Sequence, residues 1–250
     1  MWFNQTKCDI YMGTGAGKKL LHEISNAQNS VKISSPYLSV SMIKELLYLH
    51  NKGIQISLIT SCNLQNRSLK QEKCINALIK EEVHFDRKAF NKKKWTKGID
   101  LVLKAIGIIA FLYGCVQYLF YNNINSLFIV GLSITIGSVS LLTQNKVKSI
   151  KINYSTYHPI FPLRIYVSGQ YYDYTNQFIH GKFYIIDNRI AYLGSLNFTD
   201  NGTKNNYETR VRITEPEAIE KINEEFDVLF ENPDMAFLDI NEWAKEQYIH

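Results

Sequence analysis

One short segment of the sequence carries side chains suited to phosphate chemistry. His180 and Lys182 are one residue apart, and the apolar run that follows, Phe183 to Ile186, is typical of a strand. Side chains on a strand alternate between its two faces, so we expect the imidazole and the ammonium group on the same face. An imidazole can attack phosphorus while an ammonium group beside it binds the phosphate oxygens. The pair therefore predicts a site for phosphoryl transfer.

The residues after this strand add further polar groups. Asp187 and Asn188 are typical of a tight turn, and a returning strand would bring Ser195 and Asn197 back beside the first one. Small hydrogen-bonding side chains at that end can hold phosphate oxygens. Further on, the carboxylate of Glu208 is suited to orienting an imidazole through its second ring nitrogen.

Taken together, these residues resemble the signature of the phospholipase D superfamily, HxKxxxxDxxxxxxGSxN. The six matching residues are His180, Lys182, Asp187, Gly194, Ser195 and Asn197. Asn206 and Glu208 also match the family's pattern downstream, and residues 18–60 look like its opening helix, strand, helix and strand. The resemblance implies an α/β fold, a phospholipase D-like layered α-β-α domain.

Only one copy of the complete signature is present. Superfamily members with one motif resemble half of a two-motif enzyme and form their site across a two-fold dimer. The resemblance therefore implies a homodimer, in which His180 attacks phosphorus to give a phosphohistidine and His180 of the partner subunit protonates the leaving oxygen.

The same resemblance assigns roles to the other candidate residues. Lys182 and Asn197 would bind the non-bridging phosphate oxygens, Ser195 would support that network, and Glu208 would orient His180. Asp187 belongs to the catalytic signature, but we interpret it as a structural partner of the turn rather than a chemical participant. No metal and no cofactor are implied.

A glycine-rich segment near the N-terminus, residues 13–18, does not have the spacing of a phosphate-binding loop. A Walker loop would need glycine where Met12 stands and serine or threonine where Lys19 stands. We interpret the segment as a loop that leads into the first helix, with no apolar strand before it.

An uncharged stretch interrupts the domain. Residues 105–145 contain no Asp, Glu, Lys or Arg, and two apolar runs, at about 101–121 and 126–142, are separated by asparagines. The first run is long enough to cross a bilayer and the second only just, so it could be re-entrant instead. A buried hairpin of a soluble core is the alternative, but such helices usually have a polar face. We also expect the pairs Ala110 with Gly114 and Ser133 with Gly137 to let the two helices pack closely.

Both flanks of the stretch are basic, with lysines at 92, 93, 94, 97 and 104 before it and at 146, 148 and 151 after it. Because a two-helix hairpin places both flanks on one side, the positive-inside rule puts that side in the cytoplasm. The sequence thus predicts a multi-pass membrane protein with a cytoplasmic catalytic domain. We divide it into residues 1–90, the first half of the phospholipase D-like domain, 91–148, a transmembrane hairpin, and 149–250, the catalytic half.

The composition of the chain excludes some classes of protein and disfavours some kinds of site. The chain has 250 residues and a net charge of +5, and its four cysteines form no CxxC pair, which disfavours metal clusters and disulfides. Outside the uncharged stretch the composition is that of a soluble globular domain, which excludes a disordered or collagen-like chain.

The predicted activity is that of a membrane-anchored phosphodiesterase. The hairpin would hold the site near lipid headgroups, which favours a phospholipid substrate and membrane lipids as partners. The single motif and the continuation Asn197-Phe198-Thr199 resemble the nuclease-like branch of the superfamily, so a metal-independent endonuclease acting on DNA or RNA is the alternative. A third reading, a non-catalytic membrane adaptor, would need a broken motif.

Overall fold

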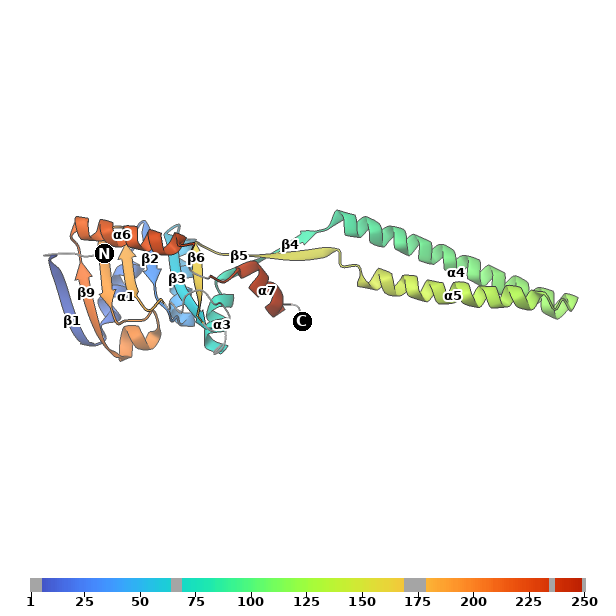
Figure 1. The fold of residues 1–250 in the computed structure, drawn as a ribbon, viewed down its shortest axis with the longest axis horizontal. Helices are drawn as coiled ribbons and strands as arrows, with labels where there is room; N and C mark the ends of the chain where they lie inside the picture. Colours follow the sequence, from blue (N-terminus) through green and yellow to red (C-terminus); the bar gives the residue numbers. More distant parts are fainter. Residues whose placement is uncertain (1–5, 64–68, 169–178, 234–236, 249–250) are drawn as a thin grey trace. The chain divides into compact units, whose positions relative to one another are not determined.

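The computed structural model describes residues 6–63, 69–168, 179–233 and 237–248. The chain forms two compact units: the first joins Met1–Glu81 with Tyr157–His250, and the second is Glu82–Thr156. The predicted hairpin, 91–148, lies inside the second unit. The chain enters and leaves that unit through a two-stranded sheet of β4 (Ile79–Phe85) and β5 (Asn153–Pro159) (Figure 1).

A seven-stranded mixed sheet forms the centre of the first unit, in the order β1-β9-β8-β7-β2-β3-β6. The bounds of its strands are β1 (Cys8–Thr14), β2 (Ser30–Ser34), β3 (Gln55–Asn63), β6 (Leu163–Ser168), β7 (Lys182–Ile186), β8 (Ile190–Gly194) and β9 (Tyr207–Ile213). The ladders β2–β3 and β3–β6 are parallel, and the other ladders are antiparallel.

These directions bring many strand ends to one edge of the sheet. The last residues of β1, β2, β3, β6 and β8 and the first residues of β7 and β9 all lie there. We call it the motif edge, because Lys182 begins β7 and Gly194 ends β8. His180 and Lys182 therefore lie at the same edge as Gly194 and Glu208, whereas Asp187 lies at the other end of β7.

Helices cover both faces of the sheet, as the predicted α-β-α layering requires. On one face, α1 (Gly17–Ser25) and α2 (Val40–Asn51) bury Leu20, Ile24, Ile43 and Leu46 in one apolar cluster with side chains of β2 and β7. On the other face, α6 (Pro216–Glu231) buries Ile222 and Phe226 in a second cluster. The remaining helices of this unit are α3 (Leu69–Asn76), the π-helical turn η1 (Asn201–Asn205) and α7 (Ile240–Tyr248).

The glycine-rich segment leads into the first helix as predicted, since α1 begins at Gly17, but the structure corrects the prediction that no strand comes before it. A strand, β1, precedes it and pairs with β9. β1 is an edge strand whose side chains are almost all exposed, Ile10 and Met12 among them. Because neither face is buried, the sequence does not need the alternation of apolar and polar residues that identifies a strand.

The second unit is a hairpin of two long helices, α4 (Arg87–Tyr121) and α5 (Ser126–Ser149). Asp86 caps α4 by accepting a hydrogen bond from the amide of Ala89 at 2.9 Å, and Asn122, in the left-handed conformation, ends it. Both helices are long and apolar enough to cross a membrane, and only 11% and 17% of their most apolar windows are buried. Such low burial is unlike the core helices of a soluble protein. Each helix extends beyond its apolar run into its basic flank.

Close packing at a glycine and a polar contact hold the hairpin together. A Cβ atom on Gly114 would lie 2.8 Å from Cγ2 of Val130, so the two helices touch there. The buried Asp100 accepts hydrogen bonds from Ser140 at 2.6 Å and Thr143 at 3.0 Å. Of the predicted small-residue pairs, Ser133 is buried, but Gly137 has open space where its Cβ would be.

The hairpin packing makes a testable prediction. Gly114→Val should destabilise the reconstituted hairpin by about 1–3 kcal/mol, because the new side chain must push α5 away. Gly131→Val is the matched control, since nothing lies within 4 Å of a Cβ at Gly131. Thermal unfolding in nanodiscs measures both. Equal melting temperatures for the two variants would show that the helices do not pack at Gly114.

Candidate active site

The two residues best suited to phosphate chemistry lie together at the start of β7. Lys182 is buried, with 6% of its surface exposed, whereas His180 is exposed. The Lys182 Nζ atom lies 2.9 Å from Nδ1 and 3.0 Å from Nε2 of His180, and it donates a hydrogen bond to the His180 carbonyl at 2.7 Å. β7 begins at Lys182, so His180 lies just before the strand rather than on it. The ammonium group and the imidazole are nevertheless side by side.

Burial affects the charge of this lysine. Loss of solvation lowers the pKa of Lys182 below its ordinary value, and the carboxylate of Glu208 acts in the opposite direction and raises it. The net change is a lowering. Since this carboxylate, also buried, acts on the ammonium group, the start of β9 contributes to the same site as the start of β7.

Ser195 and Glu208 are brought together where β8 ends and β9 begins. Ser195 Oγ donates a hydrogen bond to Oε2 of Glu208 and accepts one from the Thr209 amide at 3.0 Å. The second carboxylate oxygen accepts from the Asn206 side chain at 3.1 Å. The carboxylate is thus held by two side-chain donors, one of them a predicted phosphate ligand.

A close backbone approach makes this contact possible. A Cβ atom on Gly194 would lie 2.0 Å from the carbonyl oxygen of Thr209, so any side chain at 194 would force β8 and β9 apart. The glycine of the signature is therefore required by packing.

Asn197 lies two residues beyond Ser195 in the loop that leaves β8. Its neighbours Leu196 and Phe198 are buried, with 2% and 0% exposed surface. Within the described residues the Oδ1 atom of Asn197 is buried and has no hydrogen-bond partner. Oδ1 only accepts hydrogen bonds, whereas binding a non-bridging phosphate oxygen would use the Nδ2 donor, so the predicted role of Asn197 stays a prediction.

Asp187 lies at the other end of β7, away from the motif edge. Its carboxylate accepts hydrogen bonds from the amides of Gln28 at 3.0 Å, Asn29 at 2.6 Å and Ser30 at 2.9 Å. Asp187 and Asn188 have φ values of 52° and 51°, which form the tight turn expected between β7 and β8. Burial on its own would raise the pKa of Asp187, but the three amides outweigh it and lower the value. This geometry supports the structural interpretation of Asp187.

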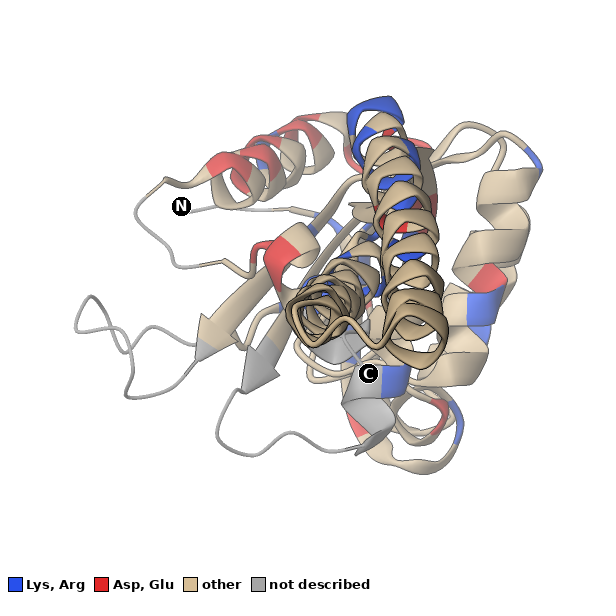
Figure 2. Ribbon diagram, turned by 90° about the vertical axis from the view of Figure 1, so that its right-hand side faces the viewer, with Lys and Arg blue, Asp and Glu red and all other residues tan. Residues whose placement is uncertain are grey.

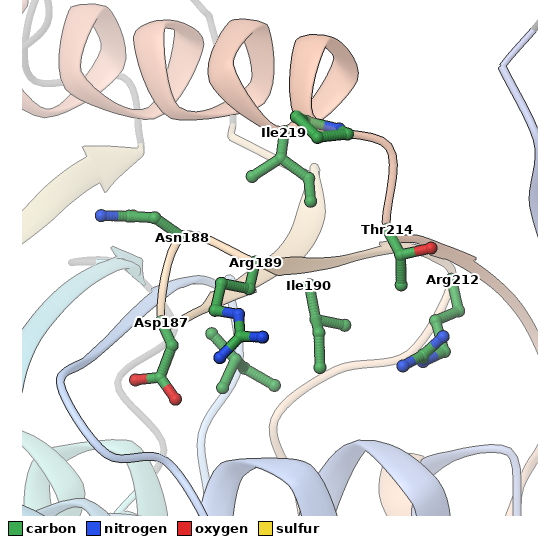
Figure 3. A pocket seen from close by; sticks show the side chains of 9 residues that line it. Asp187, Asn188, Arg189, Ile190, Arg212, Thr214 and Ile219 are labelled. Carbon is green, nitrogen blue, oxygen red and sulfur yellow. The ribbon is translucent and has the colours of Figure 1, made fainter.

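A hollow lined by charged side chains lies at that same opposite end, with a volume of about 570 Å³ (Figure 3). Asp187, Arg189 and Arg212 line it, together with Thr214 and Ile219. Arg212 forms an ion pair with Glu23 at 3.0 Å and Asp187 holds the backbone amides, so much of this charge is already compensated. The hollow is separate from the motif edge.

The described part of the chain holds neither a second complete signature nor a cluster of metal-binding side chains. His50 and Lys52 repeat the H-x-K spacing at the end of α2, but Ser57 stands where the signature has aspartate. Among the described residues there is no group of three or more His, Cys, Asp or Glu side chains placed to hold a metal ion.

Comparison with known proteins agrees with the motif. Residues 135–230 match the family described as "Cardiolipin synthase, PLD-like domain", which confirms the predicted resemblance. No match was found among the curated proteins.

Three solved structures are similar in fold. Nuc, a phospholipase D family member from Salmonella typhimurium, is 14% identical, with 93% of this chain and 99% of that one covered and a TM-score of 0.47. NucT from Helicobacter pylori is 16% identical, with 94% and 100% covered and a TM-score of 0.45. Phosphatidylserine synthase from Haemophilus influenzae is 10% identical, with 96% and 42% covered and a TM-score of 0.43.

The contacts of Asp187 predict a pH-dependent contribution to stability. Asp187→Asn should lower the free energy of unfolding at pH 7 by about 2 kcal/mol, the usual worth of charge-assisted hydrogen bonds. Because the pKa of Asp187 is lowered by folding, the contribution is complete above the unfolded value and is lost as the pH falls through the folded value.

Urea unfolding of the wild type and Asp187→Asn from pH 7 down to pH 3 measures this effect. The difference between the two stabilities should become smaller toward the acid end. A constant difference at every pH would mean that the carboxylate charge does not hold the turn.

Proposed function

We propose that this chain is a membrane-anchored phosphodiesterase of the phospholipase D type that hydrolyses a phospholipid at a homodimer interface. The observation that carries the proposal is the contact of the buried Lys182 with both ring nitrogens of His180, beside the Ser195–Glu208 pair, at one edge of the sheet. A nucleophile, a cation and hydrogen-bond donors within one small site are what phosphoryl transfer needs.

In the proposed reaction a ring nitrogen of His180 attacks phosphorus and the bond from phosphorus to the leaving alkoxide breaks. His180 of the partner subunit gives that oxygen a proton and becomes neutral. It then takes a proton from water, whose oxygen attacks phosphorus and breaks the phosphorus–nitrogen bond. Lys182 and Asn197 bind the non-bridging oxygens, Ser195 supports them, and Glu208 orients the imidazole.

The requirement for two imidazoles supports the homodimer. The histidine that becomes bonded to phosphorus cannot also protonate the leaving group, so the reaction needs a second acid. The sequence contains one complete motif, and a second copy of the chain supplies the other.

The charge distribution favours lipid over nucleic acid. Residues 82–156 contain ten Lys or Arg and three Asp or Glu, whereas the rest of the chain contains 18 and 20. The positive charge is thus concentrated beside the apolar helices, where it suits anionic headgroups and a cytoplasmic location (Figure 2). The unit that carries the motif has a slight excess of acidic residues, many of them on α6. Domains that bind nucleic acid backbones are typically basic.

A substrate panel tests the proposal. Purified protein and His180→Ala are incubated in EDTA with phosphatidylcholine, phosphatidylglycerol, cardiolipin, single-stranded DNA and RNA. We expect release of headgroup or phosphatidic acid, reduced at least 10³-fold in the variant because covalent catalysis is removed. Cleavage of nucleic acid alone would mean that the protein is an endonuclease and not a phospholipase. No cleavage of any substrate would favour an adaptor.

The charge of Lys182 predicts how kcat/KM falls at alkaline pH, which is the alkaline limb of the pH profile. Phosphate binding needs the ammonium form, and the pKa of Lys182 is lowered by burial, so kcat/KM should begin to fall below the ordinary lysine pKa of 10.5. Glu208 raises this pKa, so Glu208→Gln should shift the limb to lower pH. A limb that moved to higher pH in this variant would contradict the electrostatic effect of Glu208 on Lys182.

A further inference from the structure

The loop that carries Ser195 and Asn197 belongs to no strand or helix until η1 begins. Its backbone is nevertheless bonded at successive residues. The Tyr184 hydroxyl donates a hydrogen bond to the Leu196 carbonyl at 2.6 Å, and the Phe198 amide donates one to Ser35 Oγ at 2.9 Å. The two bonded groups directly flank Asn197.

Both hydroxyls are in the core. Tyr184 has 2% of its surface exposed and Ser35 has none. A buried hydroxyl without a partner is costly, so these groups remain bonded to the loop as long as the core is intact. The surrounding apolar side chains need neither hydroxyl for packing, and phenylalanine or alanine would fill much of the same space.

Each hydroxyl is itself fixed by the sheet. Tyr184 lies on β7 two residues after Lys182, with its side chain on the same face. Ser35 follows β2, where its amide donates to the Ile59 carbonyl at 3.0 Å and its hydroxyl donates to the Tyr37 carbonyl at 2.8 Å. Burial also raises the pKa of the Tyr184 hydroxyl, so it stays a neutral donor at any pH used for an assay.

We propose that Tyr184 and Ser35 are positioning residues that fix the loop presenting Ser195 and Asn197 to the phosphate. The catalytic part of this inference rests on the proposed function. The hydrogen bond from Tyr184 fixes the position of Asn197 relative to the strand that carries Lys182, and the one to Ser35 fixes it relative to β2. The cation and the amide thus keep a constant separation.

Tyr184→Phe is the central variant, because it removes only the hydroxyl. We expect kcat to fall about 10-fold or more with KM changed less than about 3-fold, since a small misplacement of groups that bind the transition state costs this much. The alkaline limb of the pH profile should not move, because Lys182 is unaltered. Hydrogen exchange of the peptide that covers residues 195–199 should be faster. Ser35→Ala should do the same through the Phe198 amide.

Tyr192→Phe is the matched control. Tyr192 is equally buried, with 1% exposed, but its hydroxyl bonds to Glu23 of α1 instead of the loop. A merely structural role would make the two tyrosine variants alike, each with a lower melting temperature and unchanged kcat per folded molecule. That result, or unaltered exchange of the 195–199 peptide in Tyr184→Phe, would overturn the inference.

The exchange measurement separates this inference from the proposed function. If the wild type cleaves nothing, the proposed function fails, yet faster exchange in Tyr184→Phe and not in Tyr192→Phe would still support loop positioning. If the wild type is active and Tyr184→Phe matches it in kcat, the positioning role is wrong and the proposed function stands.

Discussion

The site depends on how closely β8 and β9 approach each other at Gly194. A Cβ atom at position 194 would lie only 2.0 Å from the Thr209 carbonyl oxygen, so no side chain fits there. Because glycine has no side chain, the Ser195 amide reaches that carbonyl at 3.1 Å. The same approach places the Ser195 hydroxyl on the Glu208 carboxylate. Since that carboxylate acts on the ammonium group of Lys182, three strands are tied together electrostatically at one edge. Because β7, β8 and β9 are antiparallel neighbours, the start of β7, the end of β8 and the start of β9 meet at this edge.

The two units differ in their charge and in the roles that we propose for them. The first unit is a layered domain with a small excess of acidic residues, and it carries every signature residue. The second unit is a hairpin with exposed apolar helices and a strongly basic flank. Under the proposed function, the hairpin anchors the chain and attracts anionic lipid, and the first unit carries out proton and phosphoryl transfer. This separation supports an enzyme whose substrate is met at a membrane surface.

Much of this arrangement could be predicted from the sequence, because motif spacing and apolar runs are local signals. The motif indicated the family, and the runs 101–121 and 126–142 lie within α4 and α5. β1 was not predicted, since an exposed edge strand has no inward apolar pattern. Neither were the roles of Tyr184 and Ser35, which arise from contacts across 12 and 163 residues of sequence and have no local signature. The orientation of Gly137 depends on which side of α5 faces α4, and spacing leaves that open.

The proposed function requires that His180 forms a covalent bond to phosphorus. A single turnover with excess protein and phospholipid, quenched in denaturant at alkaline pH and followed by digestion and mass spectrometry, would trap this bond. We expect a phosphatidyl group on the peptide that contains His180, which forms and decays as product appears. Product formation with an adduct on another residue, or an unchanged rate in protein that lacks the His180 imidazole, would contradict it.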